Sequence, residues 1–542
     1  MLAKPSKAQL EWHRMERSMF VHFGPAAFLG KEYDDCSYPL DQFNPAQLDT
    51  EQWCQAALSW GAGMIILVAK HFGGFCWWQT DTTEYSVKNT PWRNGKGDLL
   101  AELSASCQKH GLKLGVYIYP GDEIHSVGNG GKAKDPAYQE TYNQIYRQQL
   151  TEVLTRYGEV AEVWFDGSCA IPMEDILQKH APDALVFQSP CCSVRWCGTE
   201  QGCLPLNAWS TLKESDRRSG VATVVQSDPN GDAWAPLEVD TTLYDHFWFW
   251  SPSNTAKRKS LEHLIRIYYQ SVGRGGVLLL NSAPTTTGLI DEADMARYRE
   301  FGAELSRRFG SPLGTASGEG EELLLELPPE TPVNHVRVKE EIQEGERIRA
   351  YRLEARTGQG WTLLARGEHL GAQKLFVFED IRTDCIRLTV EKSVETPLIR
   401  ELSAFRVEAA DLPELIAAQQ ENVLSYDPVS GGWISLEQGQ AAGSWKKEAF
   451  CQGELELTLD ISGAVPQPGQ YAISFVNEEG EAELLSLTAI LDGDEAGEML
   501  SSTQKGFCLT RTGAVVPGKS SSVLKAVLKG ASNGTVYVKR LV

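Results

Sequence analysis

The chain has 542 residues, more than one domain usually contains, so we expect two or three domains. Its hydrophobic fraction of 42% and charged fraction of 23% are close to globular averages and exclude a disordered or fibrous chain. The chain has 51 Lys and Arg and 72 Asp and Glu, which gives a net charge of −21. This negative charge disfavours nucleic acid and anionic membranes as partners.

Short apolar runs alternate with helix-like patterns along the first three hundred residues. The predicted strands are 19–23, 64–69, 112–119, 160–165, 184–188, 221–226 and 277–281, and the predicted helices are 49–60, 99–110, 138–157, 260–272 and 291–309. Eight such units in about 250 residues match a TIM barrel, whose active site lies at the carboxyl ends of the strands. A doubly wound open sheet competes, but no glycine-rich phosphate loop supports it. We therefore predict an α/β fold with a TIM-like barrel as catalytic domain over residues 1–312.

The composition and the hydrophobic pattern of the sequence change after this region. Residues 310–320 are rich in glycine, serine and acids, which predicts a linker. From residue 322 apolar residues alternate with period two between turns, as in an antiparallel β-sandwich, and strand patterns return after a second boundary near 409–422. We expect C-terminal β-sandwich domains over 321–409 and 420–542.

Neither a membrane span nor a secretory signal is evident. The longest apolar runs, such as 64–69, are far shorter than the roughly 20 residues of a membrane helix, and the first twenty residues lack a signal's apolar segment. We expect a cytoplasmic protein, or a secreted one whose signal was trimmed. Twelve cysteines without regular spacing or a CxxC pair predict reduced, buried thiols.

Tryptophan and histidine concentrate in the N-terminal part, where 12 of 15 Trp and eight of 10 His lie before residue 264. Aromatic faces suit sugar rings, and His supplies proton chemistry. Two of these histidines, His22 and His71, lie at the ends of the first two predicted strands. A lone strand histidine is usually a core group, but two at neighbouring strand ends favour a site. Trp77-Trp78 and residues 247–250 offer aromatic faces for a sugar or for the core.

The strongest single feature is Asp166, which ends the apolar run VWFDG and would point into the mouth of a barrel. The alternative is a helix N-cap, since Asp-Gly is a common turn pair. Glycoside hydrolysis needs a second carboxylate, and the candidates are Glu200, in a glycine-rich segment beside Trp196, and Glu238. Either glutamate could instead be a surface acid.

Other chemistries have weaker support. Cys191, Cys192, Cys197 and Cys203 cluster downstream of His180, but their spacing does not match the paired ligands of structural zinc sites. No G-x-S-x-G motif or protease-like cysteine context is present. We therefore predict neither a metal nor another cofactor.

Several motifs together resemble glycoside hydrolase family 29, the α-L-fucosidases. In family order over residues 12–309 they are FVHFG, AKHFGGFCWWQTDTTEYSV, GLKLGVYIYPGD, EVWFDG, VRWCGTEQG, EVDTTL with FWFW, and GGVLLLNSAPTTTGLIDEADMARYREFG. Residues 332–407 also resemble a discoidin-like, galactose-binding type sandwich.

The resemblance implies a retaining β/α-barrel hydrolase with Asp166 as nucleophile. VRWCGTEQG resembles the branch acting on α-1,3- and α-1,4-linked fucose, as in Lewis-type glycans, and makes Glu200 the acid/base. The fucose contacts it implies are His22, Glu32, His71, Tyr117 and Trp248. The expected partners are fucosylated oligosaccharides or glycoconjugate glycans, and the oligomeric state is not indicated.

Two positions depart from the family pattern. Phe72 stands where the family has a second histidine, and Gly121 stands where it usually has tryptophan, so we expect a lost fucose contact and a more open aglycone side. Alternatives are another retaining barrel glycosidase, such as a hexosaminidase or α-galactosidase, and a carbohydrate-binding protein with an inactive barrel. An apolar patch near Trp248 that accepts the fucose methyl group would separate the glycosidases.

Overall fold

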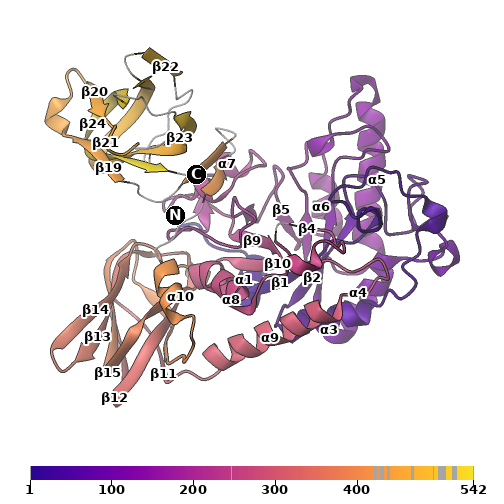
Figure 1. The fold of residues 1–542 in the computed structure, drawn as a ribbon, viewed down its shortest axis with the longest axis horizontal. Coiled ribbons are helices and arrows are strands. Elements are labelled where there is room, and N and C mark those ends of the chain that lie inside the picture. The colour runs from indigo at the N-terminus through magenta and orange to yellow at the C-terminus, as the bar shows by residue number, and fades with distance from the viewer. Residues whose placement is uncertain are drawn as a thin grey trace. The chain divides into compact units, whose positions relative to one another are not determined.

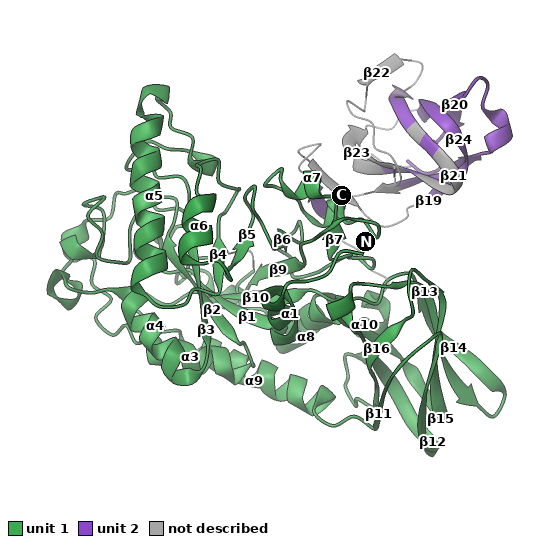
Figure 2. Ribbon diagram, turned by 180° about the vertical axis from the view of Figure 1, so that it is seen from behind, with its two compact units in different colours: residues 1–420 green, residues 421–542 purple. Residues whose placement is uncertain are grey.

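The computed structural model describes residues 2–245, 247–419, 424–427, 432–435, 440–465, 469–491, 494–498, 508–515 and 522–540. The chain divides into two compact units, Met1–Gln420 and Glu421–Val542, which Figure 2 shows in different colours. The first unit contains an eight-stranded parallel sheet followed by a six-stranded antiparallel sheet, and the second contains further antiparallel strands (Figure 1).

The parallel sheet forms the barrel. Its strands are β1 (Arg17–Val21), β2 (Met64–Lys70), β3 (Lys113–Ile118), β4 (Glu162–Trp164), β5 (Leu185–Phe187), β6 (Arg195–Trp196), β9 (Leu237–Thr242) and β10 (Val277–Ser282). Their order is β5-β4-β3-β2-β1-β10-β9-β6, and a parallel bridge between Phe187 and Val194 connects the two edges. The sheet is thus nearly closed, which confirms the predicted TIM-like barrel followed by β-sheet domains.

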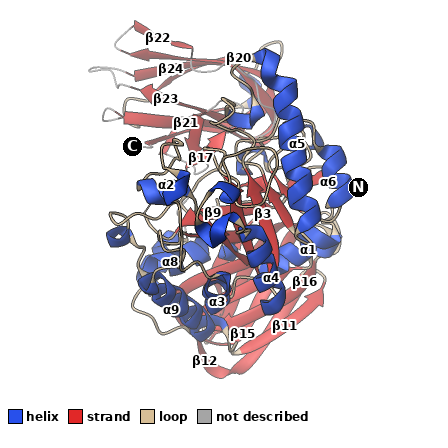
Figure 3. Cartoon of the chain, turned by 90° about the vertical axis from the view of Figure 1, so that its right-hand side faces the viewer, coloured by secondary structure: helices blue, strands red, loops and turns tan. Residues whose placement is uncertain are grey.

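Helices surround these strands, as Figure 3 shows. They are α1 (Lys7–Met15), α2 (Pro25–Leu29), α3 (Thr50–Ser59), α4 (Leu99–His110), α5 (Gln139–Arg156), α6 (Glu174–His180), α7 (Glu214–Arg217), α8 (Leu261–Gln270) and α9 (Glu292–Phe309). Five of them begin after a polar residue whose side chain accepts a backbone N–H of the first turn: Ser6, Asp49, Asp98, Ser260 and Asp291. These caps satisfy donors that a helix start leaves unpaired, so the caps specify where the helices begin.

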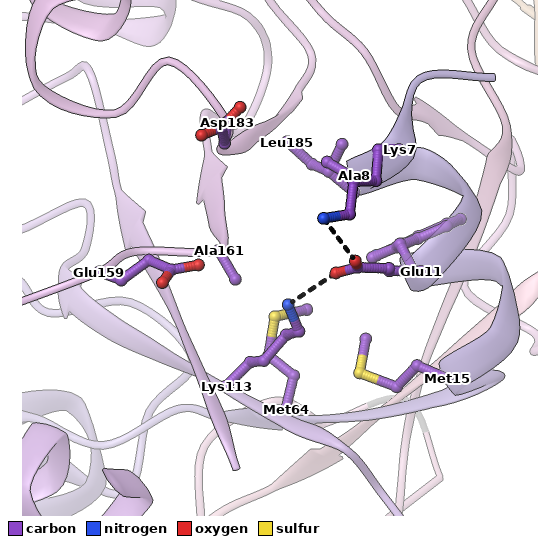
Figure 4. Close-up of a pocket in the computed structure, with 11 residues that line it drawn as sticks. Lys7, Ala8, Glu11, Met15, Met64, Lys113, Glu159, Ala161, Asp183 and Leu185 are labelled. Carbon is purple, nitrogen blue, oxygen red and sulfur yellow. Dashed lines mark hydrogen bonds and ion pairs between the residues drawn. The ribbon is translucent and has the colours of Figure 1, made fainter. Parts of the chain in front are cut away.

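The amino-terminal end of the barrel contains a cavity of about 220 Å³ (Figure 4). Glu11 of α1 pairs there with Lys7 at 3.9 Å and with Lys113, the first residue of β3, at 3.4 Å. Beside it, Trp12 Nε1 donates to the buried Glu162 Oε2 at 2.9 Å. This end of a TIM barrel contributes to stability, whereas chemistry occurs at the opposite end.

The predicted strand at 221–226 is wrong. Val224–Gln226 is a 3-10 helix, because Thr223 and Gln226 form a capping box that closes a turn. The strand that enters the barrel instead is β9, whose LEVDTT sequence carries two acids. Glu238 and Asp240 are both buried in the barrel. The acidic residues that hide this strand in the sequence therefore lie inside the sheet.

The six-stranded sheet comprises β11 (Gly314–Glu319), β12 (Glu322–Glu340), β13 (Ile348–Thr357), β14 (Gly360–Gly367), β15 (Lys374–Ser393) and β16 (Leu398–Phe405), in the order β11-β16-β12-β15-β13-β14. The predicted linker 310–320 is therefore wrong over most of its length, since β11 pairs antiparallel with β16. Helix α10 (Leu412–Ala418) follows and packs against both α8 and β15.

In the second unit the described strands are β17 (Leu424–Asp427), β18 (Gly432–Ser435), β19 (Gln440–Trp445), β20 (Glu454–Asp460), β21 (Gly469–Leu491), β22 (Asp494–Glu498), β23 (Cys508–Val515) and β24 (Ser522–Arg540). The long strands β21 and β24 pair along most of their length, around a core that includes Ile473, Leu487 and Leu528. The domain boundaries at 312, 409 and 420 remain predictions. Along the described ranges, no helix combines the length and apolar composition needed to cross a bilayer.

Candidate active site

The residues that the sequence singled out meet at the carboxyl ends of the barrel strands. His22 directly follows β1 and His71 directly follows β2, while Asp166 lies two residues beyond β4. Tyr117 is on β3, and Glu200 and Trp248 lie in the loops after β6 and β9. Hydrogen bonds or ring contacts connect all of these side chains and Glu32 into one cluster: His22, Glu32, His71, Tyr117, Asp166, Glu200 and Trp248.

Asp166 presents an exposed side chain at this mouth. Tyr117 donates its phenolic O–H to Asp166 Oδ2 at 3.1 Å. Reduced solvation among the walls of the mouth raises the pKa of Asp166, and the charge of Glu200 raises it further, whereas the Tyr117 bond opposes the shift. A carboxylate that is reached by solvent but only partly hydrated, and is oriented by one donor, is well suited to attack a bound electrophile.

Trp248 orients Glu200, the second carboxylate of the mouth. The indole Nε1 donates to Glu200 Oε2 at 3.3 Å, and the backbone N–H of Trp248 donates to Glu32 Oε2 at 2.8 Å. The loop that carries Glu200 turns at Gly198 and Gly202, which have φ values of +86° and +77°. Only glycine adopts these values without strain, and a Cβ at Gly202 would lie 2.9 Å from Ile267, so the two glycines specify the position of Glu200.

Both histidines are neutral, and a hydrogen bond orients His22. Asn281 donates its amide Nδ2 to the Trp248 carbonyl at 2.7 Å, so its Oδ1 faces His22 Nδ1 at 2.7 Å and accepts a proton from it. His22 therefore has its Nε2 lone pair available as an acceptor. Burial, and then the neighbouring His71, lower the pKa of His22 well below its usual value, and burial lowers the pKa of His71 to about 4.

The low pKa of His71 predicts an acid-sensitive fold. In the unfolded chain this imidazole takes up a proton near pH 6.5, but in the folded protein only near 4, so folding stability falls as the pH falls through that window. We expect wild type to lose about 2 kcal/mol more unfolding free energy between pH 7 and 5 than His71→Gln does. Urea unfolding at both pH values measures this difference, and equal losses in the two proteins would contradict the neutral assignment.

A further carboxylate, Asp240 on β9, lies beside this cluster and was not singled out by the sequence. It is 3% exposed, and its Oδ1 accepts the Trp196 Nε1–H at 2.7 Å. Burial, followed by the charge of Glu200, raises the pKa of Asp240 well above its usual value. Asn281 was missed as well. In both cases the available signal was a polar residue inside or at the end of an otherwise apolar strand.

Glu238, the alternative second carboxylate, lies inside the barrel rather than at the mouth. It is the second residue of β9 and is paired in register with Val277, the first residue of β10. Its side chain is 0% exposed and accepts the Trp164 Nε1–H at 2.6 Å. Burial and the neighbouring Glu162 raise its pKa well above the ordinary value. Glu200 is thus the carboxylate better placed to meet a substrate.

The remaining candidates from the sequence analysis lie outside the active-site cluster. Trp77 and Trp78 are 1% and 0% exposed and belong to the core, where they donate to Phe23 O and Glu152 Oε2. Cys191, Cys192 and Cys197 are free thiols. Within the described residues, no three His, Cys, Asp or Glu side chains are grouped so that they could hold a metal ion.

The two departures from the family pattern lie on one wall of the mouth. Phe72 packs between Tyr33 and Tyr119, with ring centroids 5.7 and 6.1 Å away. A Cβ at Gly121 would lie 2.5 Å from Tyr119 Cε1 and 2.7 Å from Gly128 O, so a larger side chain does not fit here without rearrangement. Tyr33, 65% exposed, forms the outer part of this wall.

Comparison with known proteins shows which family the barrel resembles. Residues 4–308 match the family model described as Alpha-L-fucosidase. Alpha-L-fucosidase 1 of Arabidopsis thaliana is 32% identical over 454 residues, which cover 74% of this chain and 88% of that protein.

Solved structures are similar over the same region. A Bacteroides thetaiotaomicron protein has a TM-score of 0.71 and 34% identity, covering 75% of this chain and 100% of that chain. A GH29 fucosidase of Ruminococcus gnavus in complex with fucose has a TM-score of 0.66 and 28% identity, covering 76% and 97% of the two chains. The chain belongs to the α-L-fucosidase family of glycoside hydrolases.

Proposed function

We propose that this α-L-fucosidase is a retaining exo-enzyme that removes terminal α-1,3- and α-1,4-linked fucose from Lewis-type glycans by double displacement. The observation that carries the assignment is the pair of carboxylates at the mouth. Asp166 is oriented by the Tyr117 hydroxyl and Glu200 by the Trp248 indole, and their charges interact. In this proposal Asp166 is the nucleophile and Glu200 is the acid/base.

The reaction then has two steps. An Asp166 oxygen attacks the anomeric carbon while the bond to the leaving oxygen breaks and Glu200 gives that oxygen its proton. Glu200 next takes a proton from water, whose oxygen displaces Asp166 and restores the original configuration. Retaining glycosidases have carboxyl groups about 5–5.5 Å apart. The mechanism thus uses one carboxylate as the electron-pair donor and the other as the proton carrier.

The surrounding side chains suit a fucosyl residue. A neutral His22 Nε2 accepts a hydroxyl proton, and His71, Glu32 and Tyr117 add polar contacts around the ring. Below them Phe20, 1% exposed, packs 4.6 Å from His22 and 6.1 Å from Trp248 between ring centroids. The partly buried Trp248 ring, which packs on Phe20, is the apolar surface that we expect to favour the methyl group of fucose over the hydroxymethyl group of the sugars that hexosaminidases or α-galactosidases bind.

The linkage preference is the finer part of the proposal. We expect kcat/KM to be higher for Lewis trisaccharides, in which fucose is linked α-1,3 or α-1,4 to a GlcNAc that also carries galactose, than for 2′-fucosyllactose. The galactose would contact the Glu200 loop and the aromatic wall of Tyr33 and Phe72, and such remote contacts raise turnover only where they strengthen in the transition state. The measurement is initial-rate kinetics on α-1,2-, α-1,3-, α-1,4- and α-1,6-fucosylated oligosaccharides.

An aryl α-L-fucoside serves as the control in this panel, because it reports catalytic competence without a sugar aglycone. Equal or faster hydrolysis of the α-1,2 substrate would overturn the linkage preference while leaving the fucosidase assignment intact.

A further inference from the structure

A second cavity lies where the barrel meets the six-stranded sheet, within the first compact unit. It has a volume of about 290 Å³ and is lined by residues of the loop after β6, of α8, of the turn before β10, of β13 to β15 and of α10. Figures 1 and 2 show α10 beside α8 and the sheet at this place. The cavity is separate in sequence from every residue assigned to the fucose site.

The charge of this cavity is opposite to that of the chain. Its described lining contains Lys374, Arg274 and Arg366 but only one acid, Glu368, whereas acids exceed bases by 21 in the whole sequence. Glu368 is exposed and accepts the Asn207 amide at 3.3 Å. The described lining thus has an excess of positive charge.

Lys374 is the most unusual of these groups. It is 7% exposed, and its ammonium donates to the carbonyl of Leu206, which also lines the cavity. No ion pair of Lys374 occurs among the described residues. Burial, followed by the charge of Arg274, lowers the pKa of Lys374 to about 7. A buried ammonium satisfied by a neutral carbonyl is costly unless an anion joins it.

Arg274 faces the same cavity and is 4% exposed. Its guanidinium donates to the carbonyls of Leu204, Ala418 and Gln419, and so connects the loop after β6 with α10. Arg366 on β14 is exposed at the cavity's edge. Two buried cations and one exposed cation therefore surround a space that a negative group can enter from solvent.

We propose that this cavity binds a small anion, a carboxylate or phosphate group on a body of monosaccharide size, with Lys374 as its direct counter-ion. The volume holds about ten water molecules at roughly 30 Å³ each, which is sufficient for such a molecule. The aromatic rings of Tyr351 and Phe376 line the cavity and suit the less polar face of a ring. The inference is independent of the roles assigned to Asp166 and Glu200.

Binding should be linked to proton uptake. An anion beside Lys374 favours its charged form, so at pH 8 the complex should take up as much as about one proton. The charged or titratable neighbours are Arg274, Arg366, Glu368, His369, Tyr269 and Tyr351. Of these, His369 has a lowered pKa and both tyrosines have raised ones, so Lys374 is the group expected to titrate between pH 7 and 9.

Isothermal titration calorimetry of the full chain tests this with glucuronate, glucose 6-phosphate and inorganic phosphate, and with glucose as the neutral control. We expect glucuronate to bind about tenfold or more weakly at pH 9 than at pH 7, with proton uptake seen as a dependence on buffer ionisation enthalpy. Glucose should not bind. Preference among the three anions identifies whether a carboxylate, a sugar phosphate or free phosphate is the ligand.

Lys374→Met should weaken binding of the preferred anion by tenfold or more and remove the proton uptake. Lys392→Met is the matched control, because Lys392 is an exposed lysine at the other end of the same strand. Arg366→Met provides a second cavity variant at an exposed position, and circular dichroism with aryl-fucoside hydrolysis verifies that each variant is folded. Unchanged affinity in both cavity variants, or binding of none of the three anions by wild type, would overturn the proposal.

Discussion

Asp166→Asn is expected to lower kcat on an aryl α-L-fucoside by about 10⁴-fold or more while leaving the fold intact, as loss of a nucleophile does in other hydrolases. The amide has nearly the same shape, and its oxygen can still accept the Tyr117 hydroxyl that bonds Asp166 at 3.1 Å. What it loses is the negative charge that attacks the anomeric carbon. Because an aryl leaving group departs readily, the loss reports on the nucleophile rather than on the acid.

Asp183→Asn is the matched control for this prediction. Asp183 is an exposed aspartate lining the cavity at the opposite end of the barrel, so the same chemical change there should leave kcat unaltered. Thermal unfolding of both variants separates a catalytic effect from a folding defect. Asp166→Gly with added azide should then yield a fucosyl azide of inverted configuration. Activity of Asp166→Asn within tenfold of wild type would remove Asp166 from the role.

The barrel could be predicted because most of its strands are continuous apolar runs. The predicted run 64–69 became β2, all seven residues of which are buried, and 277–281 became most of β10. Strands of a parallel barrel are covered by helices outside and by side chains inside, so their sequences do not alternate. β9 could not be recognised in this way, since Glu238 and Asp240 interrupt its apolar pattern with buried acids.

The prediction of a linker at 310–320 was wrong for the opposite reason, because β11 has the composition of a loop. It is an edge strand, mostly exposed, whose glycine, serine and acid content is typical of a loop. Its strand conformation depends on pairing with β16, some eighty residues later in the chain. Edge strands often carry charges and small residues that discourage further pairing, so local composition underestimates them.

The candidate site was predictable to the extent that it follows strand ends. His22, His71 and Asp166 were found by that rule, and Glu32, Glu200, Tyr117 and Trp248 by family resemblance or glycine-rich context. Asn281 was not found, because its importance arises from bonds to His22 and to the Trp248 carbonyl, 33 residues away in sequence. Contacts of that kind depend on which strands become neighbours, and no local pattern encodes them. The catalytic roles themselves remain predictions.

Glu200→Ala is expected to slow hydrolysis of fucosylated oligosaccharides by about 10²–10⁴-fold, the usual contribution of general acid catalysis. Hydrolysis of an aryl fucoside should fall much less, because a phenolate leaves without a proton. Truncation also removes the acceptor of the Trp248 indole bond at 3.3 Å. Part of any increase in KM would therefore reflect movement of that ring. Glu200→Gln keeps the indole's acceptor and removes only the transferable proton, and it should reproduce the leaving-group dependence.

Glu238→Gln is the comparison that decides between the two glutamates. Glu238 is buried in the barrel and accepts the Trp164 indole N–H, so its amide variant should affect both substrates alike, through stability or the position of Trp164, which lies two residues before Asp166. The measurement is the ratio of kcat/KM for a Lewis trisaccharide to that for an aryl fucoside in each variant. A ratio that collapses in Glu238→Gln and stays at the wild-type value in Glu200→Gln would transfer the acid/base role to Glu238, and would require the leaving oxygen to reach a carboxylate that the structure encloses within the barrel.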